Sequence, residues 1–598
     1  MARREAEEAA EATVEKKRKI SDDLAAIDLV PIPAEESWVE QGLDVILAAV
    51  ADSSPVGRPR RLAALLELER RSGILRNLRT ARETAETLWL QLRDTASGDV
   101  HALCLCVAAL ETLACSPKII DAEARLKLQP HPRLARGQSE LIADAIVHEM
   151  IEAVTTPKIA PRLMQRCMIA LLRIGAARPE MQRPGLGSAI GLTLREGNSQ
   201  CRKVALELLA QSKVSVGSQE GLQICRSFRK DADHVVRAAA IMSLQAWRPM
   251  DATMLEDAVS SLSDDIAEVR EQALVWLGNI AIDNRSFHFP KSKKTEVKLT
   301  DSCFMQVCGA VFDSEMSVRE EACRVLGTIP AVSVHYMLQT LTKKVLSSEQ
   351  LNEVEQTALE GEGDLQISQG SSLLTADAAG AFVVALEDEF WQVRCAAIGS
   401  ICDLALRSRT FREKAMDVLV DMLADEIEKV RVAAVNALSR LRNVIEFAEH
   451  HLQVVLSLLE DVSEPLRARV QLMLGMIPLT SPLCLNLTVR ALLDNIRRYP
   501  SDTPNIYKAL SKLGKNCSAL AEEVTPALLV HRTDDQLESP YLTTQADVDD
   551  ETYVGILVMV LSAAAVNPHV LAQCPSHCLR HWRLLRHKHP HLIPWIKV

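Results

Sequence analysis

The amino-acid sequence predicts an all-α protein, built as a solenoid of stacked antiparallel helix pairs. Aromatic residues make up only 4% of the chain while alanine and leucine are abundant, a composition that favours helices over sheets. A short pattern of aspartate, arginine, a small residue and leucine also recurs along the chain. At 598 residues the chain is too long for a single core, so an array of repeats is the expected architecture.

The recurring pattern has a constant internal spacing. Aspartate stands six residues before an arginine, a small or branched residue follows three after that arginine, and Leu or Ile follows seven after it. The copies contain Asp231 and Arg237, Asp264 and Arg270, Asp313 and Arg319, Asp388 and Arg394, Asp425 and Arg431, and Asp461 and Arg467. A seventh copy, EGNSQCRKVALELL around Arg202, has Glu in place of Asp. Successive arginines are 35, 33, 49, 75, 37 and 36 residues apart, so the two long intervals must contain insertions.

One copy, DMLADEIEKVRVAAVNALSRL at residues 421–441, shows what each unit builds. The preceding stretch predicts a first helix, because its apolar residues fall on one face: Ala415, Val418, Leu419 and Met422. Asp425 then stands where an N-cap is needed, and Glu428 completes a capping box. The second helix has one apolar stripe, formed by Val430, Ala434, Ala437, Leu438 and Leu441. Such a pair cannot bury its apolar face alone and must stack on further copies, which is the pattern of HEAT repeats.

The repeated arginine has two interpretations. It can bridge to the acidic turn of the adjacent repeat, which would form a ladder along the solenoid. It can equally be a solvated arginine at the start of a helix.

The repeat pattern and the composition divide the chain into four regions. We expect a disordered, charged tail over residues 1–37 and degenerate helical repeats over 38–190. The clear HEAT array covers 191–480, with a basic loop inserted at 284–301 and an acidic, polar insertion at 347–375. Further helical repeats fill 481–598 and are interrupted by an acidic loop at 532–552.

The chain contains none of the common sequence signatures of catalysis. Phosphate loops, dinucleotide fingerprints, GxSxG elbows and HExxH motifs are all missing from the sequence, so we predict no enzymatic activity, no metal site and no cofactor. One cluster, CPSHCLRHWRLLRHKHPHL at 574–592, has Cys-x3-Cys and His-x3-His spacings that can bind zinc. Its ligands interleave, however, which favours an amphipathic and partly basic helix.

Charge and cysteine usage restrict the compartment and the partners. A net charge of −11 argues against a protein that coats nucleic acid, although local basic patches remain possible. Lys291, Lys293 and Lys294 are candidates for a polyanion contact, or belong to a solvated loop. The run Lys16, Lys17, Arg18 and Lys19 has the composition of a nuclear-import signal. Fifteen scattered cysteines indicate a reducing compartment, and without a secretory signal or an apolar run of 18 residues we expect a soluble, intracellular chain with no membrane partner.

Residues 379–499 go beyond a generic HEAT pattern. The stretches AGAFVVALEDEFWQVRCAAIGSICDLAL, FREKAMDVLVDMLADEIEKVRVAAVNALSRL and HLQVVLSLLEDVSEPLR closely resemble the Integrator complex subunit 4 family. The resemblance continues in ALLDNIRRYPSD, ALSKLGKN, DVDDETYVGILVMVLSAA and HCLRHWRLL, and upstream in SLSDDIAEVREQALVWL. It covers most of residues 195–592 and extends only loosely to the first 190.

The resemblance implies a nuclear, non-catalytic scaffold. Members of this family belong to the RNA cleavage module of Integrator, where they hold two partners with metallo-β-lactamase folds, one of them the endonuclease. That complex trims small nuclear RNA 3′ ends and attenuates RNA polymerase II transcripts, so the association of this chain with RNA and polymerase would be indirect. Family members continue past the point that matches Val598, into a region that helps to grip the nuclease pair, so the resemblance implies a chain without that region. The alternative is a HEAT-repeat adaptor of another assembly, such as nuclear import, a vesicle coat or a phosphatase scaffold, and it rests on the fold alone.

Overall fold

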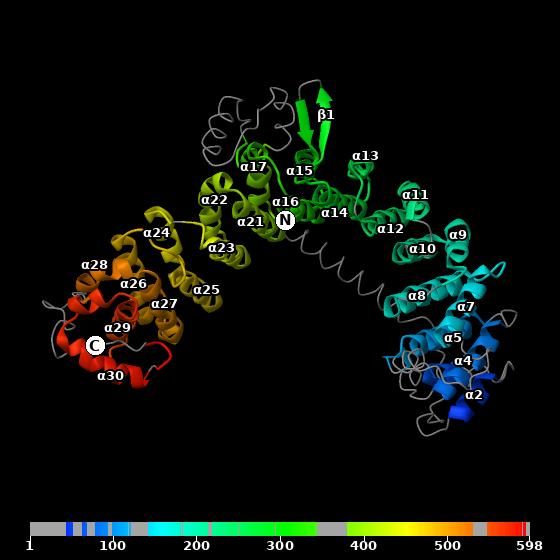
Figure 1. Cartoon of the computed structure of the whole chain (residues 1–598), viewed down its shortest axis with the longest axis horizontal. Coiled ribbons are helices and arrows are strands. Elements are labelled where there is room, and N and C mark those ends of the chain that lie inside the picture. Colours follow the sequence, from blue (N-terminus) through cyan, green and yellow to red (C-terminus); the bar gives the residue numbers. More distant parts are fainter. Residues whose placement is uncertain are drawn as a thin grey trace, which may run out of the picture. The chain divides into compact units, whose positions relative to one another are not determined.

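A computed structural model describes most of the chain (Figure 1). The described residues are 43–51, 62–68, 78–93, 99–117, 119–120, 142–179, 181, 183–212, 218–248, 250–292, 295–343, 379–445, 447–529, 547–588 and 590–593. The predicted N-terminal tail, including Lys16, Lys17, Arg18 and Lys19, lies outside them, as does the predicted insertion at 347–375. The chain divides into two compact units, Met1–Trp247 and Arg248–Val598.

The first unit contains helices that pack in sequence order. They are α2 (Leu43–Ala51), α4 (Leu78–Arg93), α5 (Val100–Ala114), α7 (Ile142–Thr155), α8 (Pro161–Ala177), α9 (Leu186–Glu196), α10 (Ser199–Gln211), α11 (Ser218–Phe228) and α12 (His234–Gln245). The helices α5, α8, α10 and α12 each pack on the next, and α4, α7, α9 and α11 pack beside them.

The second unit continues the same scheme and adds one pair of strands. Its helices are α13 (Leu255–Ser261), α14 (Ala267–Asp283), α15 (Leu299–Ala310), α16 (Met316–Thr328), α17 (Val334–Gln339), α20 (Ala381–Leu386), α21 (Trp391–Arg407), α22 (Arg409–Asp421), α23 (Glu428–Leu441), α24 (Glu449–Ser457), α25 (Glu464–Leu474), α26 (Pro482–Arg498), α27 (Thr503–Asn516), α28 (Ser518–Leu529), α29 (Glu551–Ala564) and α30 (Ser576–Lys588). Short 3₁₀ turns stand at Ala252–Met254, Met422–Ala424, Leu458–Glu460, Pro500–Asp502 and Pro568–Gln573. The strands are β1 (His288–Ser292) and β2 (Thr295–Lys298).

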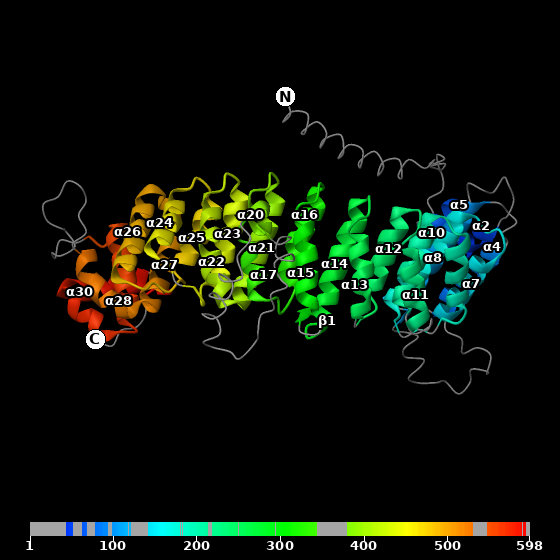
Figure 2. The same cartoon turned by 90° about the horizontal axis from the view of Figure 1, so that it is seen from above.

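Two layers of helices make up the second unit. The helices that carry the repeated arginine, α14, α16, α21, α23 and α25, pack one on the next and are followed by α27 and α29. The preceding helix of each repeat forms the other layer, and both rows can be followed in Figures 1 and 2. Ala434 and Leu438 of α23 are fully buried between the layers. A side chain as small as Ala434 lets neighbouring helices approach closely, so the fold is the all-α HEAT-repeat solenoid that the sequence predicts.

The interval of 75 residues between Arg319 and Arg394 has a local structural explanation. The short helices α17 and α20 are joined by backbone hydrogen bonds across the gap in the described residues. The N–H groups of Gly380 and Phe382 donate to the carbonyls of Gln339 and Thr340, both at 3.1 Å. Gly380 has a φ of +70°, a conformation that favours glycine. The two short helices thus supply the first helix of this repeat.

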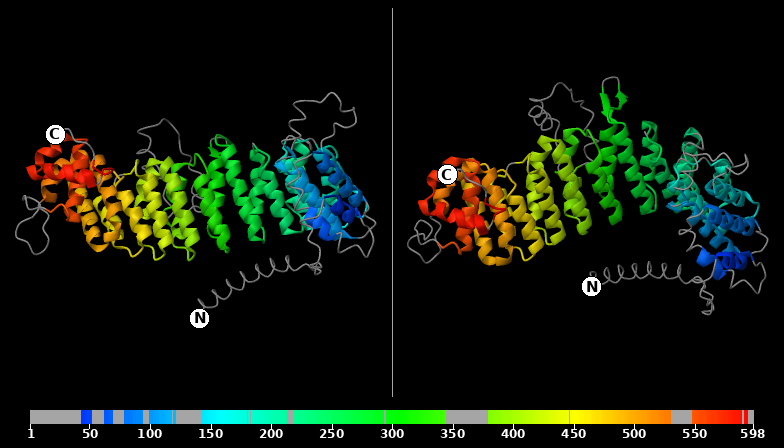
Figure 3. Two further views of the ribbon diagram at one scale, coloured as in Figure 1. Left: turned by 90° about the horizontal axis from the view of Figure 1, so that it is seen from below. Right: turned by 60° about the horizontal axis from the view of Figure 1, so that its bottom comes forward.

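The basic segment 284–301 is not a loop, and this expectation was wrong. Residues 288–292 and 295–298 form two antiparallel strands, which are visible in Figure 3. In their register His288 pairs with Lys298 and Phe289 with Val297. The N–H of Leu299 donates to the carbonyl of Phe287 at 3.0 Å and closes the base, after which α15 begins. The proline and the lysines suggested a loop because a strand proline removes a ladder donor, but a two-stranded hairpin has free edges where that donor is not needed. Lys291 lies in β1, and Lys293 and Lys294 lie outside the described residues.

Two smaller expectations also need correction. Asp425 does not cap α23: its carboxylate accepts the N–H of Ile427 at 2.8 Å, and the helix begins at Glu428. Glu428 is therefore too close to the helix start for a capping box and instead accepts the hydroxyl of Ser463 at 2.5 Å.

The predicted acidic loop at 532–552 ends before residue 552, because Asp550 caps α29 by accepting the N–H of Thr552 at 2.9 Å. Residues 530–546 of that loop lie outside the described part.

None of the helices in the described part of the chain combines the length and the apolar character that a bilayer crossing needs. All fifteen cysteines are described and carry free thiols. Burial raises the pKa of the Cys167, Cys303 and Cys323 thiols to about 12, so these groups stay protonated at neutral pH and serve as small apolar side chains.

Candidate interaction surface

Six of the seven repeated arginines form ion pairs with the turn of the next repeat. The shortest nitrogen–oxygen distances are 3.0 Å for Arg202–Asp231, 2.7 Å for Arg270–Asp313, 2.6 Å for Arg319–Asp388, 2.9 Å for Arg394–Asp425, 3.0 Å for Arg431–Asp461 and 2.7 Å for Arg467–Asp502. We call this series the ladder. Each rung joins two consecutive repeats, so the repeated residues hold one repeat at a set position on the next.

The geometry of one rung explains the six-residue spacing between aspartate and arginine. Arg431 donates to the backbone carbonyl of Asp425 at 2.9 Å, within its own repeat, while its other amino group reaches Asp461 of the next. The same bond to the carbonyl six residues earlier is made by Arg237, Arg270, Arg319, Arg394 and Arg467. The aspartate carboxylate in turn accepts the N–H two residues later, as in Asp231, Asp264, Asp313, Asp388 and Asp461. One aspartate therefore shapes its turn and receives the arginine of the previous repeat.

The last rung is the most buried and was missed by the sequence pattern. Arg467 makes two bonds to Asp502, at 2.7 and 3.1 Å, and the two side chains are only 4% and 3% exposed. Gln471 donates to the same carboxylate at 3.0 Å, and the ring of Tyr499 lies 3.7 Å from the guanidinium carbon. Asp502 stands in RRYPSD and has no arginine six residues later. Asp502 lies 35 residues after Arg467, whereas Arg394–Asp425 and Arg431–Asp461 are 31 and 30 residues apart, so the spacing gave no signal for this rung.

The ladder aspartates should make stability depend on pH. Burial by itself raises the pKa of Asp313, but hydrogen bonds from Arg270 and from the N–H of Glu315 outweigh it and hold the pKa below its ordinary value. A lowered folded-state pKa contributes stability that is present above the unfolded value, about 4, and is lost as pH falls through the folded value. We expect Asp313→Asn to be less stable than wild type at pH 7, with a difference that narrows below about pH 4. Urea unfolding, followed by circular dichroism from pH 7 to pH 3, measures the free energy of unfolding of both proteins. A difference between them that stays constant over this pH range would contradict the prediction.

The cysteine and histidine cluster of the C-terminal segment is part of a packed helix. In α30 the side chains of His577 and Cys578 are buried. The hydroxyl of Tyr553 lies 3.0 Å from Nδ1 of His581 and 3.7 Å from Sγ of Cys578. These contacts hold α30 against α29.

A different group of possible metal ligands was not singled out by the sequence. Among the described residues, Asp417, His450 and His451 are the three such side chains whose ligand atoms lie within 4.8 Å of one another. His451 is buried and its Nε2 lies 2.7 Å from Oδ1 of Asp417. This hydrogen bond ties α24 to α22 and accounts for the cluster as a contact between helices.

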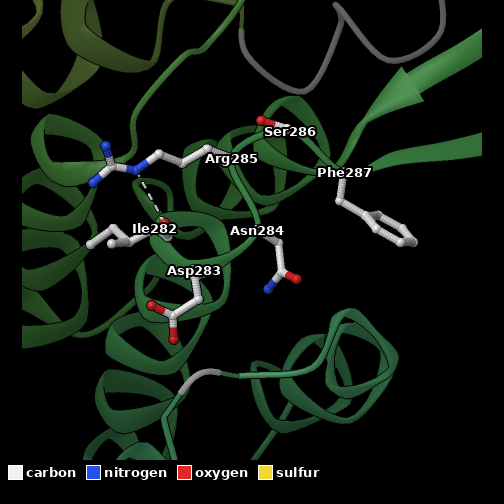
Figure 4. A pocket seen from close by; sticks show the side chains of 6 residues that line it. All are labelled: Ile282, Asp283, Asn284, Arg285, Ser286 and Phe287. Carbon is white, nitrogen blue, oxygen red and sulfur yellow. Dashed lines mark hydrogen bonds between the residues drawn. The ribbon is translucent and has the colours of Figure 1, made fainter.

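An open hollow lies where α14 meets the hairpin (Figure 4). It is lined by Ile282, Asp283, Asn284, Arg285, Ser286 and Phe287. The Asp283 carboxylate accepts Arg248 and the N–H of Met250, and Asn284 donates to the carbonyls of Met250 and Ile280, both at 2.9 Å. The side chains of Asp283 and Asn284 thus have their partners within the chain, as expected of a structural junction.

The outward side of α23, α25 and α27 carries a concentration of positive charge. The exposed basic residues are Lys429 and Arg440 of α23, Arg469 of α25, and Lys508, Lys512 and Lys515 of α27. We call this set the basic face. It occurs in a chain whose net charge is −11, so it is a local feature rather than a consequence of composition.

The sequence of the chain is similar to known proteins. A HEAT-repeat family matches residues 380–477. Integrator complex subunit 4 of Homo sapiens is 30% identical over 514 residues, which cover 80% of this chain and 52% of that protein. The Integrator complex subunit 4 homolog of Dictyostelium discoideum is 30% identical over 438 residues, covering 63% and 35%. Among solved structures, yeast importin-β (Kap95p) has a TM-score of 0.49 and 14% identity over 92% of this chain and 70% of that chain.

The chain spans about half the length of the curated relatives it matches. The similarity to the human protein extends over four fifths of this chain, and the HEAT-repeat family model covers the rungs Arg394–Asp425 and Arg431–Asp461. The chain is therefore a HEAT-repeat homologue of Integrator complex subunit 4.

Proposed function

We propose that this chain is a non-catalytic scaffold subunit of an Integrator complex in the nucleus. Its role would be to hold the metallo-β-lactamase-fold endonuclease and its pseudo-catalytic partner for small nuclear RNA 3′-end processing and for attenuation of RNA polymerase II transcripts. The observation that carries the proposal is the 30% identity to Integrator complex subunit 4 over 80% of the chain.

The physical properties of the array support a scaffold. Each repeat contacts mainly its neighbours, so the array extends with every copy and offers a long surface to partners. The ladder supports this role because each rung joins two repeats and resists sliding between them. Such a platform binds through many side chains of consecutive helices rather than through one cleft.

Two parts of the proposed function are supported by the sequence alone. The import signal at Lys16, Lys17, Arg18 and Lys19 supports the nuclear location by its composition only. A polyanion contact through Lys291, Lys293 and Lys294 would place a charged ligand on the hairpin that begins at His288.

A pull-down from nuclear extract tests the proposal. We expect the tagged full-length chain to recover a metallo-β-lactamase-fold nuclease in mild salt, while a tagged, unrelated HEAT-repeat protein of similar length does not. Absence of the nuclease from the eluate would contradict the proposal. A tagged chain found only in the cytoplasm or on membranes would favour the adaptor of another assembly.

A further inference from the structure

We infer that the basic face on α23, α25 and α27 is a docking surface for an acidic segment of a partner protein. The inference rests on the proposed scaffold role only for the identity of the partner. The chemistry of the face follows from the residues themselves and is measured without that role.

The basic face is continuous from helix to helix. Arg440 of α23 pairs with Asp403 of α21 at 2.6 Å, and Arg469 of α25 donates to Asn436 of α23 at 3.2 Å. The next contact brings α25 against α27, where a Cβ placed on Gly475 would lie 2.9 Å from the Cα of Ala509. Lys508 and Lys512 stand beside that contact on the exposed side of α27. The six basic side chains therefore belong to one side of three adjoining helices.

Acidic residues are nearly missing from these helices. The sequence of α27 contains no Asp or Glu, and α23 and α25 contain one each, Glu428 and Glu464, both at the first helical position. An acidic residue there is accounted for by the positive end of the helix dipole. The arginine helix α16, by contrast, places Glu320 and Glu321 next to Arg324 and pairs them with it. Acidic and basic side chains are thus balanced in α16, whereas basic side chains predominate in α23, α25 and α27.

Within the described residues, the lysines of α27 have no acidic partner. In the part that the structure describes, no carboxylate lies within ion-pair distance of Lys508, Lys512 or Lys515. Lys508 and Lys512 are four residues apart and Lys515 follows three later, so like charges face each other along one side of the helix. Such spacing destabilises a helix. Carboxylates of a bound partner would remove this repulsion and bring the complementary charge.

The occupant that fits this face is an acidic protein segment rather than RNA. Single-stranded nucleic acid is held by aromatic side chains on which bases stack as well as by cations. The only aromatic residue of α23, α25 and α27 is Tyr507, and it is buried. The ring of Trp391 in α21 is occupied by Lys429, whose Nζ lies 4.0 Å from the ring centroid. Leu472 of α25, the helix that also carries Arg469, is 48% exposed and offers an apolar contact. An acidic segment with interspersed apolar residues matches both features.

A binding experiment with a defined probe tests the inference. The probe is a fluorescein-labelled 20-residue peptide of glutamate and leucine, titrated with the full-length chain and followed by fluorescence anisotropy. We expect binding that weakens with added salt, and a loss of at least roughly tenfold in affinity for K508E/K512E. The matched control is K414E/R490E, which makes the same change in charge at exposed residues of α22 and α26. It should bind the peptide as wild type does.

Two results would overturn the inference. Equal affinity of K508E/K512E and wild type for the peptide would show that α27 is not the docking surface. Displacement of the peptide by an oligouridine of equal net charge, at equal or lower concentration, would show that nucleic acid is the better ligand. Circular dichroism of each variant confirms that it is folded, and neither result depends on recovery of the nuclease. The peptide titration therefore tests the docking surface, and the pull-down tests the scaffold role, so failure of one can be told from failure of the other.

Discussion

Replacing Asp502 by alanine is expected to lower the free energy of unfolding by about 3–5 kcal/mol. The substitution leaves the guanidinium of Arg467 buried without its carboxylate, and it removes one of the two acceptors of the Gln471 amide, which keeps Asn495. A buried charge that loses its partner costs far more than an exposed one, because water cannot replace the lost interaction. The hydrogen bonds of this carboxylate also hold the pKa of Asp502 below its ordinary value, despite the opposing effect of burial. Urea unfolding at pH 7, followed by helical circular dichroism, measures the loss.

The control for Asp502→Ala is an exposed ion pair of the same chemical type. Arg324 pairs with Glu320 within α16 and is 58% exposed, so Arg324→Ala should change stability by less than about 1 kcal/mol. The double variant R467M/D502L removes both charges and should be more stable than D502A. Equal effects of D502A and R324A would show that burial of the last rung does not matter.

Gly514→Ala is expected to destabilise the second unit by about 1–3 kcal/mol. A Cβ at Gly514 would collide with the carbonyl oxygen of Met559 and lie 3.1 Å from the backbone nitrogen of Ala563. Both atoms belong to the backbone of α29, so no side chain can turn away and the two helices must separate. Their separation would disturb the fully buried Tyr553 and the contact of α29 with α30. The melting temperature and the urea midpoint of the full-length chain measure the effect.

Gly399 provides the matched control for Gly514. It also lies inside a helix, α21, but a Cβ there meets no atom within 4 Å. Because alanine favours the helix more than glycine does, Gly399→Ala should leave stability unchanged or raise it by up to about 1 kcal/mol. If both substitutions have the same effect, helix propensity rather than the contact between α27 and α29 decides the result.

The repeats themselves could be predicted because their signal is local. Within one copy, the apolar stripe of α23 and the period of about 36 residues depend only on neighbours in sequence, and both predict stacked helix pairs. The hairpin at 288–298 could not be predicted in the same way, because its basic and proline-containing residues resemble a loop until two short strands pair.

The candidate surface likewise combines features that are visible in the sequence with features that appear only when the chain folds. The spacing between Asp425 and Arg431 is visible in the sequence, but the partner of Arg431 is Asp461, on another repeat. The cations of the basic face are spread over 87 residues, from Lys429 to Lys515, and share one side only because three helices stack in register. The sequence by itself determined the repeating helical unit and its kinship, since periodicity and similarity are properties of the linear chain. Only the tertiary structure decided which charges meet, because ion pairing depends on distances that folding sets.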